Sequence, residues 1–159
     1  MILQQQQEFI WDLPAEAYST PSRAGASIGQ HIRHSTDHFS RALRLRSQAQ
    51  GAVCQYDMRS RGTELEHNRN TATRVLMELS AGLQQVEASS LNRGVLVSFV
   101  LTRGGEETVL QSTIARELAF CAHHAVHHNY VMRLIADELG IAASVCSTFG
   151  FAPSTPLDG

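Results

Sequence analysis

Apolar residues recur at intervals of three and four along most of the chain, which is the period of a helix with one buried face. Four segments carry this pattern and are expected to be helices: residues 2–13, 27–49, 64–89 and 112–139. Signals for helix ends support these bounds. Ser27 and either Ser112 or Thr113 stand where N-caps belong, and Gly140 follows the last helix as a C-cap glycine.

Two further local patterns complete the expected fold. Thr63 and Glu66 have the spacing of a capping box, in which each side chain satisfies a free amide at the start of a helix. In the segment VLVSFVLTRGGEETVLQ, β-branched residues flank Gly104 and Gly105, a pattern typical of a short β-hairpin. The sequence therefore predicts an all-α four-helix bundle with a short hairpin between its third and fourth helices. It is expected to form one domain over residues 1–159, with an irregular tail over 141–159.

Composition narrows the possible functions. The 159 residues are 43% apolar, which is enough for one globular core. All 13 basic residues are dispersed arginines and the net charge is -2, so no nucleic-acid partner is expected. Because the chain has no lysine, Schiff-base and P-loop chemistries are excluded.

No apolar run is long enough for a membrane span, and the N-terminal residues lack the pattern of a secretory signal. Three widely spaced cysteines indicate reduced thiols, and a cytoplasmic protein is expected.

Histidines are concentrated on the fourth predicted helix, in the segment AHHAVHHNYV. At about 100° per residue, His128 lies within the apolar stripe of that helix and His124 lies at its edge. His123 and His127 fall on the opposite side. Residues four apart stand one above the other on a helix, so His124 and His128 have the spacing to chelate one metal ion. The alternative is that they are ordinary core histidines, each with its own hydrogen-bond partner.

A second group of histidines favours the metal interpretation. His31, His34 and His38 recur at helical spacing along one side of the second predicted helix. If the two helices are neighbours, one of these imidazoles completes a three-histidine site. Periodicity alone favours His31 or His38, because His34 lies furthest from the apolar stripe. The residues themselves therefore leave this third ligand open.

The segments SIGQHIRHSTDHF and HHAVHH, together with the helix order, resemble the DinB-like superfamily of metal-binding four-helix bundles, which includes the YfiT-type proteins. The resemblance implies an up-down-down-up bundle and a metal site made of one histidine from helix two and an HxxxH pair from helix four. By position these metal ligands are His34, His124 and His128, with His31 and His38 as alternatives to His34 or additions to it. The resemblance also implies a thiol-dependent S-transferase acting with a low-molecular-weight thiol.

Two classes of function follow for such a site. In the first, one divalent transition metal, with zinc or nickel ahead of iron, activates a thiol or a water for attack on a small electrophilic substrate, as an S-transferase or a hydrolase. In the second, the metal is structural in a non-catalytic or stress-related protein, and a homodimer is expected. A closed structural site needs a fourth protein ligand, for which His38, Glu117 and Cys121 are the candidates.

Two familiar metal motifs do not fit the chain. The spacing of His123 and His127 is that of HExxH, but His124 stands in place of the glutamate that acts as general base. Glu64 and His67 form a single Glu-x-x-His motif, whereas a ferritin-like di-iron site needs two. Zincin and di-iron chemistries are therefore not expected.

Overall fold

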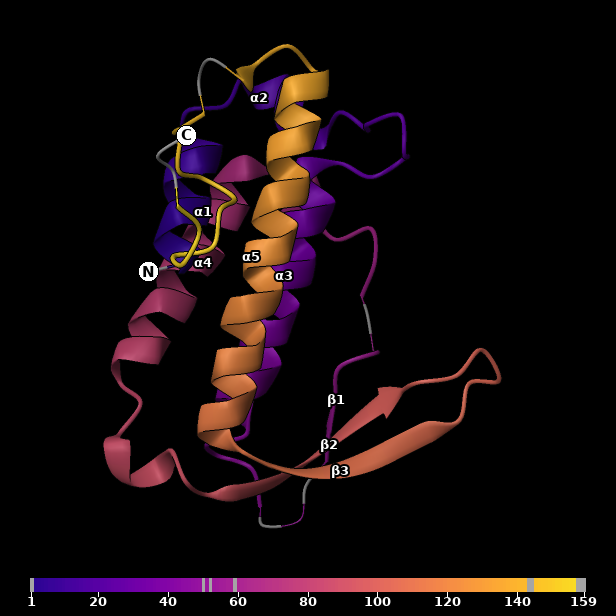
Figure 1. Cartoon of the computed structure of the whole chain (residues 1–159), viewed down its shortest axis with the longest axis vertical. Helices are drawn as coiled ribbons and strands as arrows, with labels where there is room; N and C mark the ends of the chain where they lie inside the picture. Colours follow the sequence, from indigo (N-terminus) through magenta and orange to yellow (C-terminus); the bar gives the residue numbers. More distant parts are fainter. Residues whose placement is uncertain (1, 50, 52, 59, 143–144, 157–159) are drawn as a thin grey trace.

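Two long helices lie side by side through the length of the molecule, and a small β-sheet lies across one end of the pair (Figure 1). The computed structural model describes residues 2–49, 51, 53–58, 60–142 and 145–156. The elements are, in order, α1 (Ile2–Trp11), α2 (Ala15–Ser19), α3 (Ile28–Arg44), β1 (Val53–Gln55), η1 (Glu64–Glu66), α4 (Arg69–Gln84), η2 (Ala88–Ser90), β2 (Gly94–Val100), β3 (Glu107–Thr113) and α5 (Ile114–Glu138).

The sheet has the strand order β1-β2-β3. β2 and β3 form an antiparallel hairpin in which Val97 lies opposite Leu110, and the hairpin turn contains Gly105 at a positive φ of 78°. β1 pairs in parallel with β2, with Cys54 opposite Val97. β3 leads without a break into α5, where the Thr113 side chain accepts a hydrogen bond from the Arg116 amide and caps the helix. The sheet thus fixes where α5 begins.

The core is formed by apolar side chains from α1, α3, α4 and α5. Fully or almost fully buried members are Leu3, Ile10, Ile28, Ile32, Phe39, Ala72, Leu76, Ile114, Met132 and Ile135. Their spacing along each helix is the three-and-four pattern seen in the sequence, so the predicted apolar stripes do face the core. The described part of the tail packs back on this core, since the rings of Phe149 and Phe9 stack with centroids 4.1 Å apart.

The predicted caps at Ser27, Thr113 and Gly140 are confirmed. Ser27 caps α3 through a complete capping box with Gln30, and Gly140 follows α5 with a φ of 74°. The capping box predicted at Thr63 is wrong, because the Thr63 side chain makes no capping hydrogen bond there. A short 3-10 turn comes first, and the Asn68 side chain then caps α4 by accepting from the amides of residues 70 and 71.

The predicted four-helix bundle is wrong, although the hairpin between the third and fourth long helices is confirmed. The hairpin recruits β1 as a third strand, so the described residues form a mixed helix and sheet fold instead of an all-α one. The predicted helices are also shorter than expected. Pro14 separates α1 from α2, and the third predicted helix is divided into η1, α4 and η2. Residues 143–144 and 157–159 of the predicted tail lie outside the described residues.

None of the helices in the described part of the chain is long and apolar enough to cross a membrane. The longest, α5, carries charged residues and histidines along its length.

The turn η1 is held tightly against α3, and this contact positions one wall of the site described below. Gly29 lies so close to the turn that a Cβ placed there would be 2.1 Å from the Glu66 carbonyl oxygen. The Tyr18 hydroxyl donates a hydrogen bond to the Leu65 carbonyl at 2.7 Å. The Glu66 side chain is buried and forms an ion pair with Arg33 of α3 at 2.9 Å. A glycine is required at position 29 because two backbones meet there.

We expect Gly29→Ala to lower the free energy of unfolding by about 2–3 kcal/mol, because neither backbone can yield to the added methyl group. Gly82→Ala is the matched control. It lies within α4 with only the flexible end of Leu43 at 3.3 Å, so higher helix propensity should leave stability unchanged or raised by about 0.5 kcal/mol. Urea denaturation followed by circular dichroism measures both. Equal effects of the two substitutions would contradict the close approach of η1 to α3.

Candidate metal centre

Five histidines from α3 and α5 face one another across the contact between the two helices. Because the helices run in opposite directions, His31 meets His128 while His34 meets His124. His38 lies one turn further along α3, and its ring centroid is 4.6 Å from that of His124. In both helices the facing histidines stand at three- or four-residue spacing, which places them on one side. The predicted neighbourhood of the two histidine groups is therefore present.

Four of these side chains direct the same nitrogen, Nε2, toward a common region. The Nε2 atoms of His34 and His124 are 2.9 Å apart, and those of His124 and His128 are 3.0 Å apart. The Nε2 atom of His38 lies 3.3 Å from that of His34. Ligand atoms of His34, His38 and His124 all lie within 4.8 Å of one another.

These distances fit a shared metal ion better than a hydrogen-bonded chain. A neutral imidazole Nε2 carries either one proton or one lone pair, whereas the Nε2 atoms of His34 and His124 each contact two others. Metal–nitrogen bonds of about 2.0–2.1 Å at angles between 90° and the tetrahedral value place neighbouring nitrogens about 2.9–3.4 Å apart. The three contacts between Nε2 atoms fall within this range. The residues present therefore fit a divalent transition metal.

Of the three predicted ligands, His34 and His124 belong with His38 to the group of possible metal ligands, whereas His128 adjoins that group through its Nε2 contact of 3.0 Å with His124. Ligation by these three stays a prediction. His31 contacts the other nitrogen of His128, with the two Nδ1 atoms 2.9 Å apart, and so lies outside the group of converging Nε2 atoms. His127 and His123 are exposed, as the helical wheel predicted.

Two proposed fourth ligands have other neighbours. Glu117 is fully buried and its Oε1 accepts from the Ser112 hydroxyl at 2.5 Å and from Arg116 at 2.8 Å. Cys121 lies 3.9 Å from the Tyr56 hydroxyl. Neither belongs to the group of possible metal ligands found among the described residues. Of the three candidates named from the sequence, His38 is the one that the fold brings to the cluster.

Burial keeps His128 in the neutral state that a metal ligand requires. Loss of solvent, followed by the like charges of His34 and His124, lowers the pKa of His128 from 6.5 to about 2. Burial also lowers the pKa of His31, with His127 and Arg33 adding to the effect. A neutral imidazole can donate its lone pair to a metal, whereas an imidazolium cannot. His128 is thus ready to bind an ion at neutral pH.

An aromatic wall closes the cluster on the side nearer the sheet. The ring of Phe120 lies almost parallel to that of His124 with centroids 5.6 Å apart, and Tyr56 lies 5.0 Å from His38. Burial raises the pKa of the Tyr56 hydroxyl above its ordinary range. It also raises the pKa of Cys121 to about 12 and that of Cys54 to about 11. Both thiols are therefore protonated at neutral pH and are poor nucleophiles.

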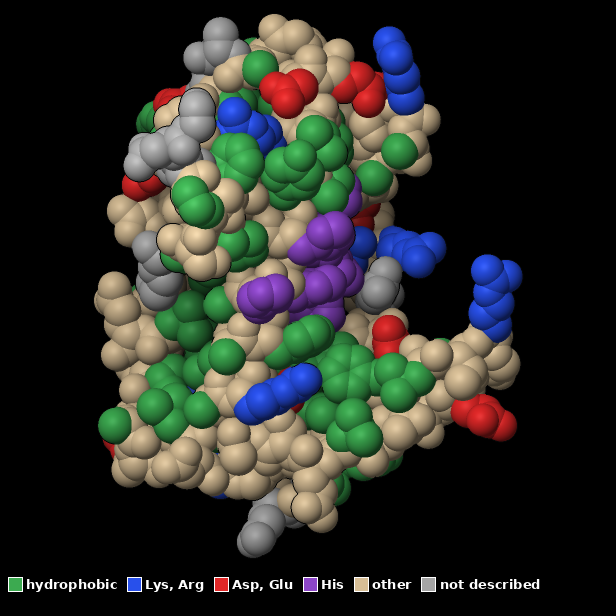
Figure 2. All heavy atoms as spheres, viewed as in Figure 1, with side chains coloured by type: hydrophobic (Ala, Val, Ile, Leu, Met, Phe, Trp, Pro, Cys, Tyr) green, Lys and Arg blue, Asp and Glu red, His purple; other side chains and the backbone are tan. Residues whose placement is uncertain are grey.

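A cavity of about 330 Å³ opens on the other side of the histidines. His31, His34 and His128 form one wall, and Arg33, Arg61 and Glu66 are on the walls around them. Figure 2 shows histidine side chains reaching the surface as one patch, with arginine side chains beside it. The cluster is therefore accessible to a small molecule from this side.

Sequence reasoning did not find the ion pair between Arg33 and Glu66. Glu66 was interpreted as the second member of a capping box, and Arg33 carried no recognisable motif. The Glu66 carboxylate in fact accepts from Arg33 Nε at 2.9 Å and from the Gly62 amide at 3.1 Å. The sequence feature that could have indicated a role for Arg33 is its position directly before His34, on the helix that carries the site.

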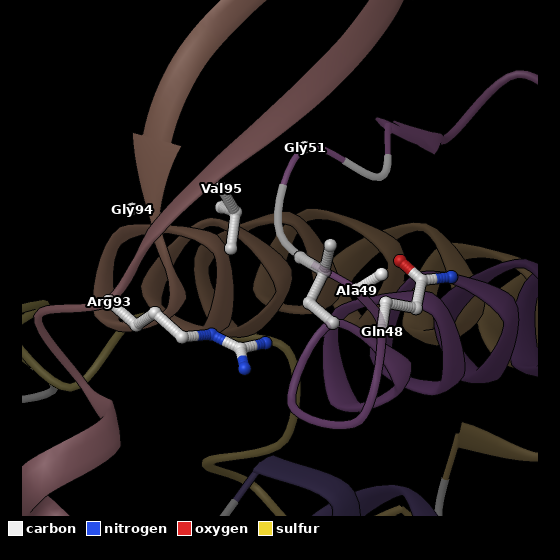
Figure 3. A pocket seen from close by; sticks show the side chains of 7 residues that line it. Gln48, Ala49, Gly51, Arg93, Gly94 and Val95 are labelled. Atoms are coloured by element: carbon white, nitrogen blue, oxygen red, sulfur yellow. The ribbon is translucent and has the colours of Figure 1, made fainter.

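A second cavity of about 370 Å³ lies between the end of α3 and the start of β2, away from the histidines (Figure 3). Its described walls include Gln48, Ala49, Val95 and one ionisable side chain, Arg93. Arg93 Nη1 donates to the Arg46 carbonyl oxygen at 3.1 Å. These walls contribute neither an acid, a base nor a nucleophile, so the histidine cluster is the stronger candidate site.

Comparison with known proteins gives one informative similarity. Over 104 residues, or 65% of its length, the chain is 33% identical to FK506-binding protein 5 of Rhizopus delemar. The match spans 26% of that protein, so the chain corresponds to about a quarter of its relative's length. Because most of the relative lies outside the match, the FK506 binding in its name is not carried over to this chain. No family model and no solved structure matches the chain.

The resemblance to the DinB-like superfamily is wrong on these findings. The similarity detected is to a protein named for FK506 binding, and the described residues include a three-stranded mixed sheet. The transferase assignment rested on the same resemblance and is corrected with it. The arrangement of the histidine side chains is observed in the structure and does not depend on this family assignment.

The lowered pKa of His128 predicts how stability depends on pH when the cluster holds no metal. Below its ordinary pKa of 6.5 the unfolded state takes up a proton at His128, whereas the folded state stays neutral there until about pH 2. The unfolded state then binds more protons, so the free energy of unfolding should fall as pH decreases from 7 toward 4. Urea denaturation of chelator-treated protein across this range measures the slope.

His128→Gln removes this titrating group and should make the slope shallower. His127→Gln, at the exposed neighbouring position, is the matched control and should leave the slope nearly as in the wild type. Equal slopes for the wild type and His128→Gln would contradict a buried, neutral His128.

Proposed function

We propose that the chain binds one divalent transition metal through His34, His124 and His128 and activates a small nucleophile toward an electrophilic small molecule. The observation that supports the proposal is the position of His124 Nε2, which lies 2.9 Å from His34 Nε2 of the antiparallel helix and 3.0 Å from His128 Nε2. Imidazole ligands suit zinc and nickel, with iron as a further candidate. A bound ion would lower the pKa of a water or thiol, which makes it a nucleophile near neutral pH.

The chain's own residues supply the setting for this reaction. His34 and His128 belong both to the cluster and to the cavity wall, so a small molecule in the cavity lies beside the nitrogens. The aromatic rings of Tyr56 and Phe120 exclude water from the opposite side. Cys54 and Cys121 have raised pKa values, so an external water or low-molecular-weight thiol is the nucleophile in this proposal.

The competing proposal is a structural metal site. Whether His38 is a metal ligand distinguishes the structural site from the catalytic one. His38 is buried and its Nε2 lies 3.3 Å from that of His34, a separation that suits a fourth ligand. Four protein ligands would close a tetrahedral site and leave no position for a nucleophile. Three ligands leave one position open, and the cavity beside His34 and His128 supports this arrangement.

We further propose a reducing compartment such as the cytoplasm, because Cys54, Cys121 and Cys146 are free thiols and two of them are buried. The expected small-molecule partner and homodimer stay predictions.

Metal content tests the first part of the proposal. Wild-type protein dialysed against zinc should retain about one ion per chain, and His124→Ala should lose most of it, because the Nε2 atom of His124 is the one that contacts those of both His34 and His128. His127→Ala changes the exposed neighbour on the same helix and should retain the metal. Elemental analysis of the folded proteins measures both. A full site in His124→Ala together with an empty one in His127→Ala would refute the proposed ligands.

Cobalt substitution tests whether the site is open. The visible absorption of Co²⁺-loaded protein should change on addition of 2-mercaptoethanol, because a thiolate occupies the free position. A spectrum that does not respond to the thiol would identify a closed, structural site. The His38→Ala variant is the control, since it opens a position that a fourth histidine had closed. A response that appears only in this variant would favour the structural proposal.

A further inference from the structure

Two arginines and one glutamate are among the residues that line the cavity beside the histidines. The charge of Arg33 is already balanced, because its Nη1 donates to Asp37 at 3.0 Å and its Nε to Glu66 at 2.9 Å. Arg61 lines the same cavity, is exposed, and has no carboxylate partner among the described residues. Arg61 is therefore the arginine of this cavity whose guanidinium is available to a ligand.

The contact between His31 and His128 fixes which nitrogen of His31 carries a proton. When the lone pair of His128 Nε2 is directed to a metal, the proton of that ring is on Nδ1. Its Nδ1 then donates to the Nδ1 atom of His31, which lies 2.9 Å away. His31 accepts at Nδ1, so its own proton is on Nε2. His31 thus becomes a hydrogen-bond donor in a residue that lines the cavity.

We infer that this cavity binds the oxyanion of a small organic acid, a carboxylate or a phosphate, through Arg61 and His31. The inference rests on the proposed metal site, because the metal sets the tautomer of His31. An arginine guanidinium offers paired N–H donors that match the two oxygens of such an anion. The volume of about 330 Å³ restricts the ligand to a small molecule.

This site gives the proposed reaction a substrate class. Glu66 is the acidic residue of the cavity, and its carboxylate is held by Arg33 and the Gly62 amide, so it does not compete for Arg61. An anion held by Arg61 and His31 lies in the same cavity as His34 and His128. The substrate is then an electrophile with an acidic group, and Arg61 and His31 bind that group.

Calorimetric titration of the zinc-loaded protein tests the inference with three probes: benzoate, inorganic phosphate and uncharged benzamide. Benzoate or phosphate should bind more tightly than benzamide, and the tighter of the two anions identifies the oxyanion. Arg61→Gln should weaken binding of that anion about tenfold, since one charge-assisted contact is lost. Arg103→Gln removes the same charge at the exposed turn of the β-hairpin and should leave the affinity unchanged.

A second measurement reports on His31 without a ligand titration. Nitrogen-15 spectra of histidine-labelled, zinc-loaded protein should show His31 protonated at Nε2 and bare at Nδ1. The opposite tautomer overturns the role of His31.

The outcomes separate this inference from the metal site. Failure of the wild type to retain zinc overturns the metal site and the anion site with it. Retained zinc with equal affinities for benzoate and benzamide, or with no effect of Arg61→Gln on anion binding, overturns the anion site alone.

Discussion

The structure depends on placing five imidazoles, one buried and four partly buried, between two packed helices. Each buried imidazole nitrogen needs a partner, and an unpartnered polar atom costs about 1–3 kcal/mol. The antiparallel pair of α3 and α5 meets this need for His31 with His128 and for His34 with His124, across contacts of 2.9 Å. In the proposed site, a cation shared by the Nε2 atoms satisfies them together.

The surrounding fold keeps these helices in register. The cap at Thr113 fixes where α5 begins relative to the hairpin, and the capping box at Ser27 fixes where α3 begins. A shift of α5 by one residue would rotate it by about 100° and turn His124 and His128 away from α3. The sheet is small, but it sets the position at which the longest helix starts. The β-sheet, which helical periodicity does not predict, therefore controls the position of α5, which helical periodicity does predict.

Short-range sequence patterns predicted the features that are determined by interactions between residues close together in the chain. The apolar stripes, the caps at Ser27 and Gly140, and the outward direction of His123 and His127 all follow from helical periodicity and backbone chemistry. β1 was missed because three residues with a parallel partner some forty positions away carry no periodic signal of their own. The cap at Asn68 was missed because a 3-10 turn displaced the start of α4 beyond Thr63. Spacing of histidines is also local, so it suggested a family whose overall fold the chain does not have.

The chemistry around the cluster limits what the protein can contribute to a reaction. The buried thiols have pKa values raised to about 11 and about 12, and Glu66 accepts hydrogen bonds from a guanidinium and an amide. None of these groups is poised to take a proton from a substrate or to attack it near pH 7. Among the described residues of the site, the histidines are the groups suited to the chemistry. In the proposed reaction the histidines bind an ion, whereas Arg61 and His31 orient the substrate next to it. Catalysis in that proposal comes from positioning and electrostatics, with the nucleophile brought in from solution.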